Sequence, residues 1–178
     1  ANGQYQSGLE VLAEQDFADL KGKNVGVVVN HTSVDQHGKH LIEKAHFKGI
    51  RITAIFSPEH GFKGMAGAGE AVEDGIEPLT GAPIYSLYGK QKKPTYEMLK
   101  NLDILVFDMQ DIGVRYYTYL STLTNILEAT SKYGIPVLVL DRMNPLGREV
   151  VGPILEEEFK SFVGMHPIPV RHGMTVGE

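Results

Sequence analysis

The chain has 178 residues, of which 42% are hydrophobic and 22% charged, and its formal net charge at pH 7 is −5. The apolar fraction is too high for a disordered chain, and no stretch approaches the ~20 consecutive apolar residues of a membrane-spanning helix. The excess of acidic residues argues against a nucleic-acid partner. The absence of Cys excludes a disulfide framework, a thiolate nucleophile and a Cys-based zinc site.

Segments typical of strands and of helices alternate along the chain. Short apolar, β-branched runs predict strands buried in a sheet, and they lie at residues 25–29, 50–56, 84–88, 104–107, 135–140 and 168–170. Capping residues and apolar residues at helical spacing predict helices, which begin after Ser7 and Thr95 and cover residues 41–45, 116–132 and 156–162. The alternation predicts an α/β fold, a Rossmann-like and mostly parallel sheet with helices on both faces.

The longest predicted helix, at residues 116–132, contains four apolar residues that we expect to face inward: Leu120, Leu123, Leu127 and Ala129. Near the other end of the chain, Thr175 and Glu178 match a capping box, the pattern that opens a helix. We therefore expect residues 1–178 to be the Rossmann-like N-terminal domain of a longer protein, with a C-terminal domain outside this sequence.

Polar side chains follow five of the predicted strands. In chain order they are Asn30; Glu59 and His60; Asp108, Gln110, Asp111 and Arg115; Asp141, Arg142 and Asn144; and Arg171 and His172. Ligands of open α/β sheets bind beyond the carboxyl ends of the strands, so we expect these residues to converge on one rim. Any single Asp or Asn in such a position also suits helix capping or a turn.

The carboxyl groups of this rim are of the kind that can hydrolyse an acetal. Two carboxyl groups at a suitable separation suffice for general acid–base catalysis. Glu59 follows an apolar strand and a proline, and apolar surroundings raise the pKa of a carboxyl so that it can donate a proton. The three arginines suggest an anionic substrate, although Arg142 could equally neutralise Asp141. One of the tyrosines near residue 117, such as Tyr117, could stack on a sugar.

Other motifs are weaker. His37 and His40 form H-x-x-H without the glutamate of a zinc protease, so we expect both at the surface. Glu59, His60, Asp108 and Asp141 could in principle bind a divalent metal. A nucleotide-binding glycine fingerprint is missing after residue 29, so we expect no cofactor.

Five segments resemble the bacterial family DUF1343, whose characterised members are NamZ-type exo-β-N-acetylmuramidases. They are residues 58–64 (PEHGFKG), 85–90 (YSLYGK), 107–119 (FDMQDIGVRYYTY), 141–145 (DRMNP) and 170–178 (VRHGMTVGE). The resemblance extends over nearly the whole chain. Met143 departs from it, since the family has Pro there.

The resemblance implies removal of N-acetylmuramic acid from the non-reducing end of peptidoglycan fragments (MurNAc-GlcNAc type). It also implies a second, C-terminal domain across the cleft and a periplasmic or extracellular location. The lactyl carboxylate of this sugar would explain the arginines. Glu59 is the expected acid, Asp108 or Asp111 would activate water or stabilise the developing positive charge, and Glu70 is a further candidate.

Two other functions remain open at this stage. A sugar-binding module without catalysis would use the same Arg and Tyr side chains. A metal-dependent esterase or phosphatase would use Glu59, His60 and Asp108 as ligands.

Overall fold

The computed structural model describes residues 5–58, 62–63, 71–72 and 75–178. Its centre is a sheet of five parallel strands in the order β5-β2-β1-β6-β7. The strands are β1 (Asn24–Val29), β2 (Arg51–Ser57), β5 (Ile84–Ser86), β6 (Ile104–Asp108) and β7 (Val137–Val139). The chain therefore builds outward from β1 to β5 and then crosses back to place β6 on the other side of β1. This is the strand order of a Rossmann-like fold.

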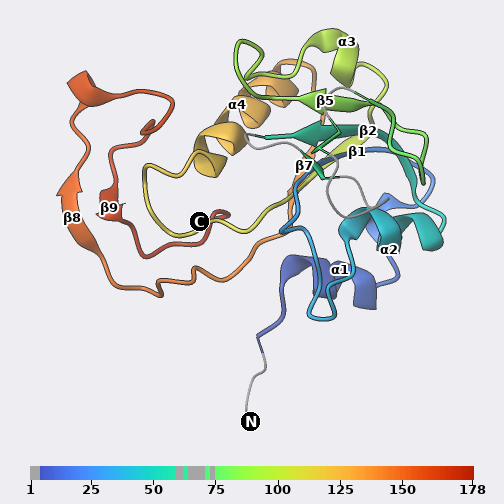
Figure 1. Ribbon diagram of the computed structural model, residues 1–178, viewed down its shortest axis with the longest axis horizontal. Helices are drawn as coiled ribbons and strands as arrows, with labels where there is room; N and C mark the ends of the chain where they lie inside the picture. Colours follow the sequence, from blue (N-terminus) through green and yellow to red (C-terminus); the bar gives the residue numbers. More distant parts are fainter. Residues whose placement is uncertain (1–4, 59–61, 64–70, 73–74) are drawn as a thin grey trace.

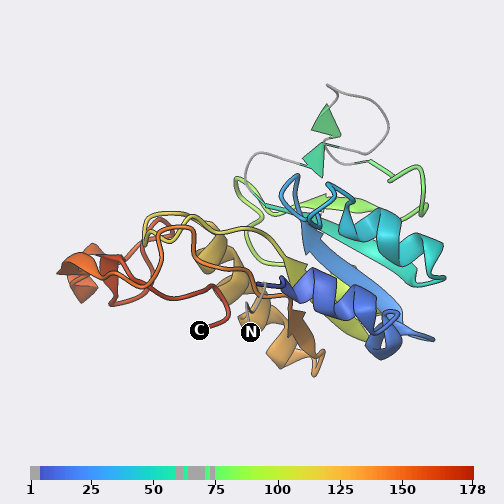
Figure 2. The ribbon, with the colours of Figure 1, turned by 90° about the horizontal axis from the view of Figure 1, so that it is seen from below.

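Helices cover both faces of the sheet, as the sequence predicts (Figures 1 and 2). One face packs on α1 (Gly8–Glu14), the short helix η1 (Ala18–Leu20) and α2 (Leu41–Phe47). The other face packs on α3 (Tyr96–Leu99) and α4 (Tyr119–Lys132). A smaller antiparallel pair is formed by β3 (Phe62–Lys63) and β4 (Ala71–Val72). Among the described residues, no helix is long and apolar enough to cross a membrane.

Strand β1 shows why the run of valines becomes a buried strand. Val25, Val27 and Val29 pack in the core on the α1 side, whereas Val28 packs in the core on the α4 side. Successive side chains of a strand point to opposite faces, so a strand covered on both faces is apolar throughout. A larger residue at position 26 would clash with the core, since a Cβ added to Gly26 would lie 2.6 Å from Leu102.

Three of the caps are formed by side chains. The Ser7 hydroxyl accepts from the Glu10 N–H while the Glu10 carboxylate accepts from the Ser7 N–H, which confirms the predicted capping box. Thr95 caps α3 as predicted. His40 caps α2 through the Ile42 N–H and is buried, so its predicted surface position is wrong; His37 is exposed.

Helix α4 begins three residues later than predicted. The Arg115 N–H donates to the Val170 carbonyl at 2.8 Å, and Val114 forms a β-bridge with Arg171. These backbone bonds tie Val114 and Arg115 to the segment around β9, and residues 115–118 form a turn, so the helix starts only at Tyr119. Leu123 and Ala129 face the core as expected, but Leu127 is 45% exposed, contrary to the prediction.

The region after β7 differs most from the sequence prediction. Residues 143–174, which we call the arm, extend away from the sheet and contain β8 (Val151–Ile154) and β9 (Pro169–Arg171). β9, the last predicted strand, pairs with β8 in a separate antiparallel sheet and does not join the parallel sheet. The five strands of the parallel sheet are completed by β5. The predicted helix at 156–162 is only a 3-10 turn, η2 (Glu157–Phe159), since its side chains have no core to pack against.

Candidate active site

The candidate site lies where the strand order reverses. β1 and β6 are neighbours, with Val29 opposite Asp108, yet the chain leaves them in opposite directions along the sheet. Such a switch point opens a crevice beyond the carboxyl ends of the two strands. Asn30 and Asp108 lie buried at the ends of β1 and β6, and Arg142 contacts Asp108 from the segment after β7. Three of the predicted strand ends therefore converge as expected.

Asp108 and Arg142 form a buried ion pair. Nε of Arg142 donates to Oδ1 of Asp108 at 2.7 Å, and Nη2 donates to Oδ2 at 3.1 Å and to the Val34 carbonyl at 3.0 Å. Burial raises the pKa of Asp108, and its bonds with Arg142 oppose that shift. Because both carboxylate oxygens contact one guanidinium, the pair has the two-pronged geometry that fixes an arginine in place.

Asp111 has a different environment. Its Oδ1 accepts from the Gly113 N–H at 2.6 Å, whereas its Oδ2 is buried without a hydrogen-bond partner. Burial raises the pKa of Asp111; the Gly113 bond and the nearby His172 oppose the shift. A carboxyl group with a raised pKa keeps its proton to a higher pH than a free carboxyl does, which suits a proton donor.

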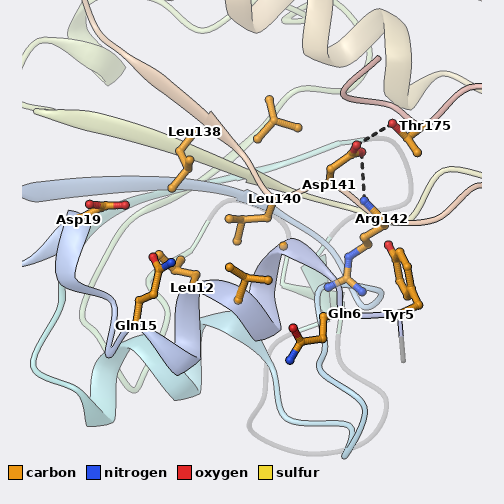
Figure 3. Close-up of a pocket in the computed structure, with 13 residues that line it drawn as sticks. Tyr5, Gln6, Leu12, Gln15, Asp19, Leu138, Leu140, Asp141, Arg142 and Thr175 are labelled. Atoms are coloured by element: carbon orange, nitrogen blue, oxygen red, sulfur yellow. Dashed lines mark hydrogen bonds between the residues drawn. The ribbon is translucent and has the colours of Figure 1, made fainter. Parts of the chain in front are cut away.

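Asp141 holds the last residues of the chain. Its Oδ2 accepts from the Thr175 hydroxyl at 2.6 Å, and its Oδ1 accepts from the Gly177 N–H at 3.1 Å and the Arg142 N–H at 3.0 Å (Figure 3). The capping box predicted at this point is present: the Thr175 N–H donates to Glu178 at 2.8 Å and the Glu178 N–H to the Thr175 hydroxyl at 3.3 Å.

Asn30 and Gln110 belong to a network across the crevice. Nδ2 of Asn30 donates to the Tyr119 hydroxyl at 2.6 Å, and its Oδ1 accepts from the Thr32 N–H at 2.8 Å. The Thr32 hydroxyl accepts from the Gln110 N–H at 2.9 Å, and Nε2 of Gln110 donates to the Met143 carbonyl at 3.0 Å. These bonds connect the ends of β1, β6 and β7 into one rigid edge.

His172 and Asn144 bring the end of the arm back to this edge. Nδ2 of Asn144 donates to the Met174 carbonyl at 2.8 Å. Nδ1 of His172 accepts from the Met174 N–H at 3.2 Å. Gly113 makes the approach possible, because a Cβ there would lie 2.1 Å from Oδ1 of Asn144.

Arg115, Arg171 and Tyr117 make contacts elsewhere. Nη1 of Arg115 donates to the carbonyls of Pro153 at 2.8 Å and Ile168 at 2.7 Å. Arg171 donates to the Leu146 carbonyl and pairs with Glu149 at 2.8 Å. The Tyr117 ring packs edge-on against Tyr119. The two arginines therefore hold the arm, while Arg142 belongs to the crevice.

Glu59, His60 and Glu70 lie outside the described residues, so the predictions made for them stay predictions. The described chain reaches Pro58 directly after β2, which pairs with β1. In the described part of the chain, no group of three His, Cys, Asp or Glu side chains is arranged to hold a metal ion. Asp108, named above as a possible ligand, has both oxygens on Arg142.

Two open hollows meet at Arg142. One, of about 450 Å³, lies between α1 and β7, and Figure 3 shows Tyr5 beside the Arg142 side chain at one end of it. The other, of about 570 Å³, includes Thr32 and Gln110. Tyr5 was not singled out in the sequence, because it follows no predicted strand and no local pattern reports a neighbour across the fold. Thr32 belongs to the polar run that follows the first predicted strand. Thr175 was visible only as a capping residue.

Comparison with known proteins identifies the family. Residues 25–178 match the family model described as "Exo-beta-N-acetylmuramidase NamZ, N-terminal". The chain belongs to this NamZ family. The resemblance to DUF1343 drawn from the sequence is thereby confirmed.

Individual proteins that are similar to this chain support the assignment to the NamZ family. A protein of Bacillus subtilis (strain 168) named peptidoglycan beta-N-acetylmuramidase NamZ is 50% identical over 175 residues, which are 97% of this chain and 42% of that protein. Two crystal structures of DUF1343 family proteins from Bacteroides fragilis NCTC 9343 superpose with TM-scores of 0.86 and 0.82, at 42% and 40% identity. Each match covers 97% of this chain and 44% of the other. The chain thus spans less than half the length of these relatives.

Proposed function

We propose that this chain is the Rossmann-like part of an exo-β-N-acetylmuramidase, which removes N-acetylmuramic acid from the non-reducing end of peptidoglycan fragments. The observation that carries the proposal is the 50% identity, over 97% of the chain, to a protein named for peptidoglycan β-N-acetylmuramidase activity. The hollow beside Arg142, which Asp141 also lines, offers a carboxyl and a guanidinium at the carboxyl end of the sheet and supports the same reaction class.

For the chemistry, we assign the two carboxyl groups to Glu59 and Asp111. Glu59 is proposed from the sequence as the acid that protonates the leaving oxygen. Asp111 has a buried oxygen without a partner and a raised pKa, so it is the described carboxyl best prepared to exchange a proton. Asp108 instead keeps Arg142 in position, because both of its oxygens accept from that guanidinium.

Arg142 is proposed to meet the lactyl carboxylate of the sugar. Its Nε and Nη2 are used by Asp108 and Val34, while no acceptor of Nη1 is found among the described residues. The side chain borders the hollow that also contains Tyr5 (Figure 3). An arginine whose remaining N–H groups face a concave surface is suited to bind a carboxylate.

The relatives are more than twice as long as the matched region, so we propose that a C-terminal domain of the same protein forms the other wall of the cleft. A closed cleft would exclude water and orient the sugar. We also propose a periplasmic or extracellular location, since the substrate is a cell-wall sugar.

The test is release of N-acetylmuramic acid from MurNAc-GlcNAc by the full-length protein that contains this chain. Glu59→Gln and Asp111→Asn are compared with the unsubstituted enzyme, on this disaccharide and on an aryl glycoside with a good leaving group. Loss of the acid should cost about 10²–10⁴-fold on the disaccharide and far less on the aryl glycoside. The variant that shows this difference identifies the acid.

Two outcomes would replace the proposal. Saturable sugar binding without any product would assign the chain to a binding module. Activity that disappears with a chelator and returns with a divalent cation would assign it to a metal-dependent hydrolase.

A further inference from the structure

An apolar groove beside α4 has no partner in the described part of the chain. It has a volume of about 420 Å³ and is bordered by Leu120, Leu123, Leu127, Val139 and Val176. Residues 120, 123 and 127 follow helical spacing and form a stripe along α4. This stripe lies next to the one that packs on the sheet through Tyr119, Leu123 and Ile126. Helix α4 therefore has a second apolar face, on which Leu127 is exposed to solvent.

The start of a helix lies at one end of this groove. The reciprocal bonds between Thr175 and Glu178 are those of a capping box, which orders the first turn of a helix. The Asp141 carboxylate holds this turn by accepting hydrogen bonds from the Thr175 hydroxyl and the Gly177 N–H. The approach is close, since a Cβ on Gly177 would lie 2.9 Å from Asp141. Val176 is buried in the α4-side core, so the turn is anchored and its direction is set.

The topology leaves part of the sheet uncovered at this place. In a parallel sheet each strand is covered by helices, and β1, β2 and β6 follow this rule. β7 is the edge strand, and its Val137 and Val139 are only partly buried on the α4 side. The arm separates β7 from Thr175 in the sequence, so the capping bonds after β7 appear only at Thr175 and Glu178.

We propose that the polypeptide following Glu178 forms a helix that begins at Thr175 and lies in this groove, against Leu123, Leu127 and Val139. The relatives, which are more than twice as long, provide chain for it. The arm is then an insertion between β7 and its helix. The seated helix also covers the α4 side of Asp111, which borders the same groove. This inference does not depend on the glycosidase activity.

The full-length protein provides the test through thiol labelling, because residues 1–178 contain no Cys. Leu127→Cys is compared with Phe47→Cys, an exposed apolar position at the end of α2, and with the unsubstituted protein as background. The thiol at position 127 should react at least about tenfold more slowly than the one at position 47, since reaction requires local opening. The slow rate should not change with protein concentration.

Equal reaction rates at the two positions would overturn the proposal. So would protection that appears only at high protein concentration, because the occupant would then be a second copy, or protection that appears only when a sugar is added. Hydrogen exchange on the unsubstituted protein gives an independent readout that needs no variant to fold. Rapid exchange throughout the ~10 residues after Glu178 would overturn the inference.

Discussion

The parallel sheet and the arm are built by different forces. The sheet buries apolar side chains on both faces, and its strands and helices account for nearly the whole core. The arm leaves most of its large apolar side chains exposed, among them Val151, Ile154, Phe159 and Val163. Its position depends on directed polar bonds to α4 and to the segment before it. The site is therefore formed by one half that is packed in the core and one half that is held by few contacts.

The polar bonds of the arm can be traced individually. The Ser121 hydroxyl donates to the Phe162 carbonyl at 2.6 Å, and the Thr124 hydroxyl lies 2.8 Å from Nε2 of His166. Arg115 donates to two carbonyls of the β8–β9 region, and Asn144 donates to Met174. Each such bond contributes only about 0.5–3 kcal/mol, so loss of one should displace the arm without unfolding the sheet.

The largest effect is expected at Arg142, where the two regions join. Arg142→Ala should lower the free energy of unfolding by about 3–5 kcal/mol, because it leaves the buried Asp108 carboxylate without its partner. Urea denaturation of the full-length protein measures the change. In the double variant Asp108→Leu with Arg142→Met, much of the loss should be recovered. Asp108→Leu and Arg142→Met are also measured singly. If the double variant lost as much free energy of unfolding as these two single variants together, the ion pair would not be the cause.

A smaller effect is expected at Gly113, which lets the arm approach the sheet. Gly22 and Gly113 both have positive φ, +74° and +81°, but an added Cβ meets nothing within 4 Å at Gly22 and would lie 2.1 Å from Asn144 at Gly113. Gly22→Ala should cost about 1 kcal/mol of backbone strain. Gly113→Ala should cost about 1–3 kcal/mol more, from the steric conflict. Equal losses in chemical denaturation would mean that Asn144 moves aside freely.

The smallest change in overall stability is expected at Arg115. Arg115→Gln removes the bonds to Pro153 and Ile168, so proteolysis within residues 150–168 should accelerate by about tenfold or more. The melting temperature of the sheet should hardly change. Arg51→Gln is the matched control, since Arg51 also donates to a carbonyl, that of Gly22, but at the sheet. If both variants were cleaved at the unsubstituted rate, Arg115 would not hold the arm.

The sequence by itself determined the sheet and its covering helices. The valines of β1 are apolar at consecutive positions, a pattern that only a strand buried on both faces requires, and the caps at Ser7 and Thr95 act within four residues. Polar residues at the ends of β1, β6 and β7 also predicted the crevice, because parallel strands all end at one edge. These features are local or follow from topology, so sequence patterns report them.

Only the tertiary structure decided which polar residues pair and where the arm goes. Asp108 contacts Arg142 from 34 residues away, and His40 is buried because its Nε2 reaches the Asn30 carbonyl at 2.8 Å. Residues 168–170 have the composition of a sheet strand, but their bonds to β8 and to Arg115 place them outside the sheet. Leu127 fits the inward stripe of α4, yet it is 45% exposed in the described part of the chain. Local composition reports the tendency of a side chain to be buried, whereas the partner that buries it is set by the packing of distant segments.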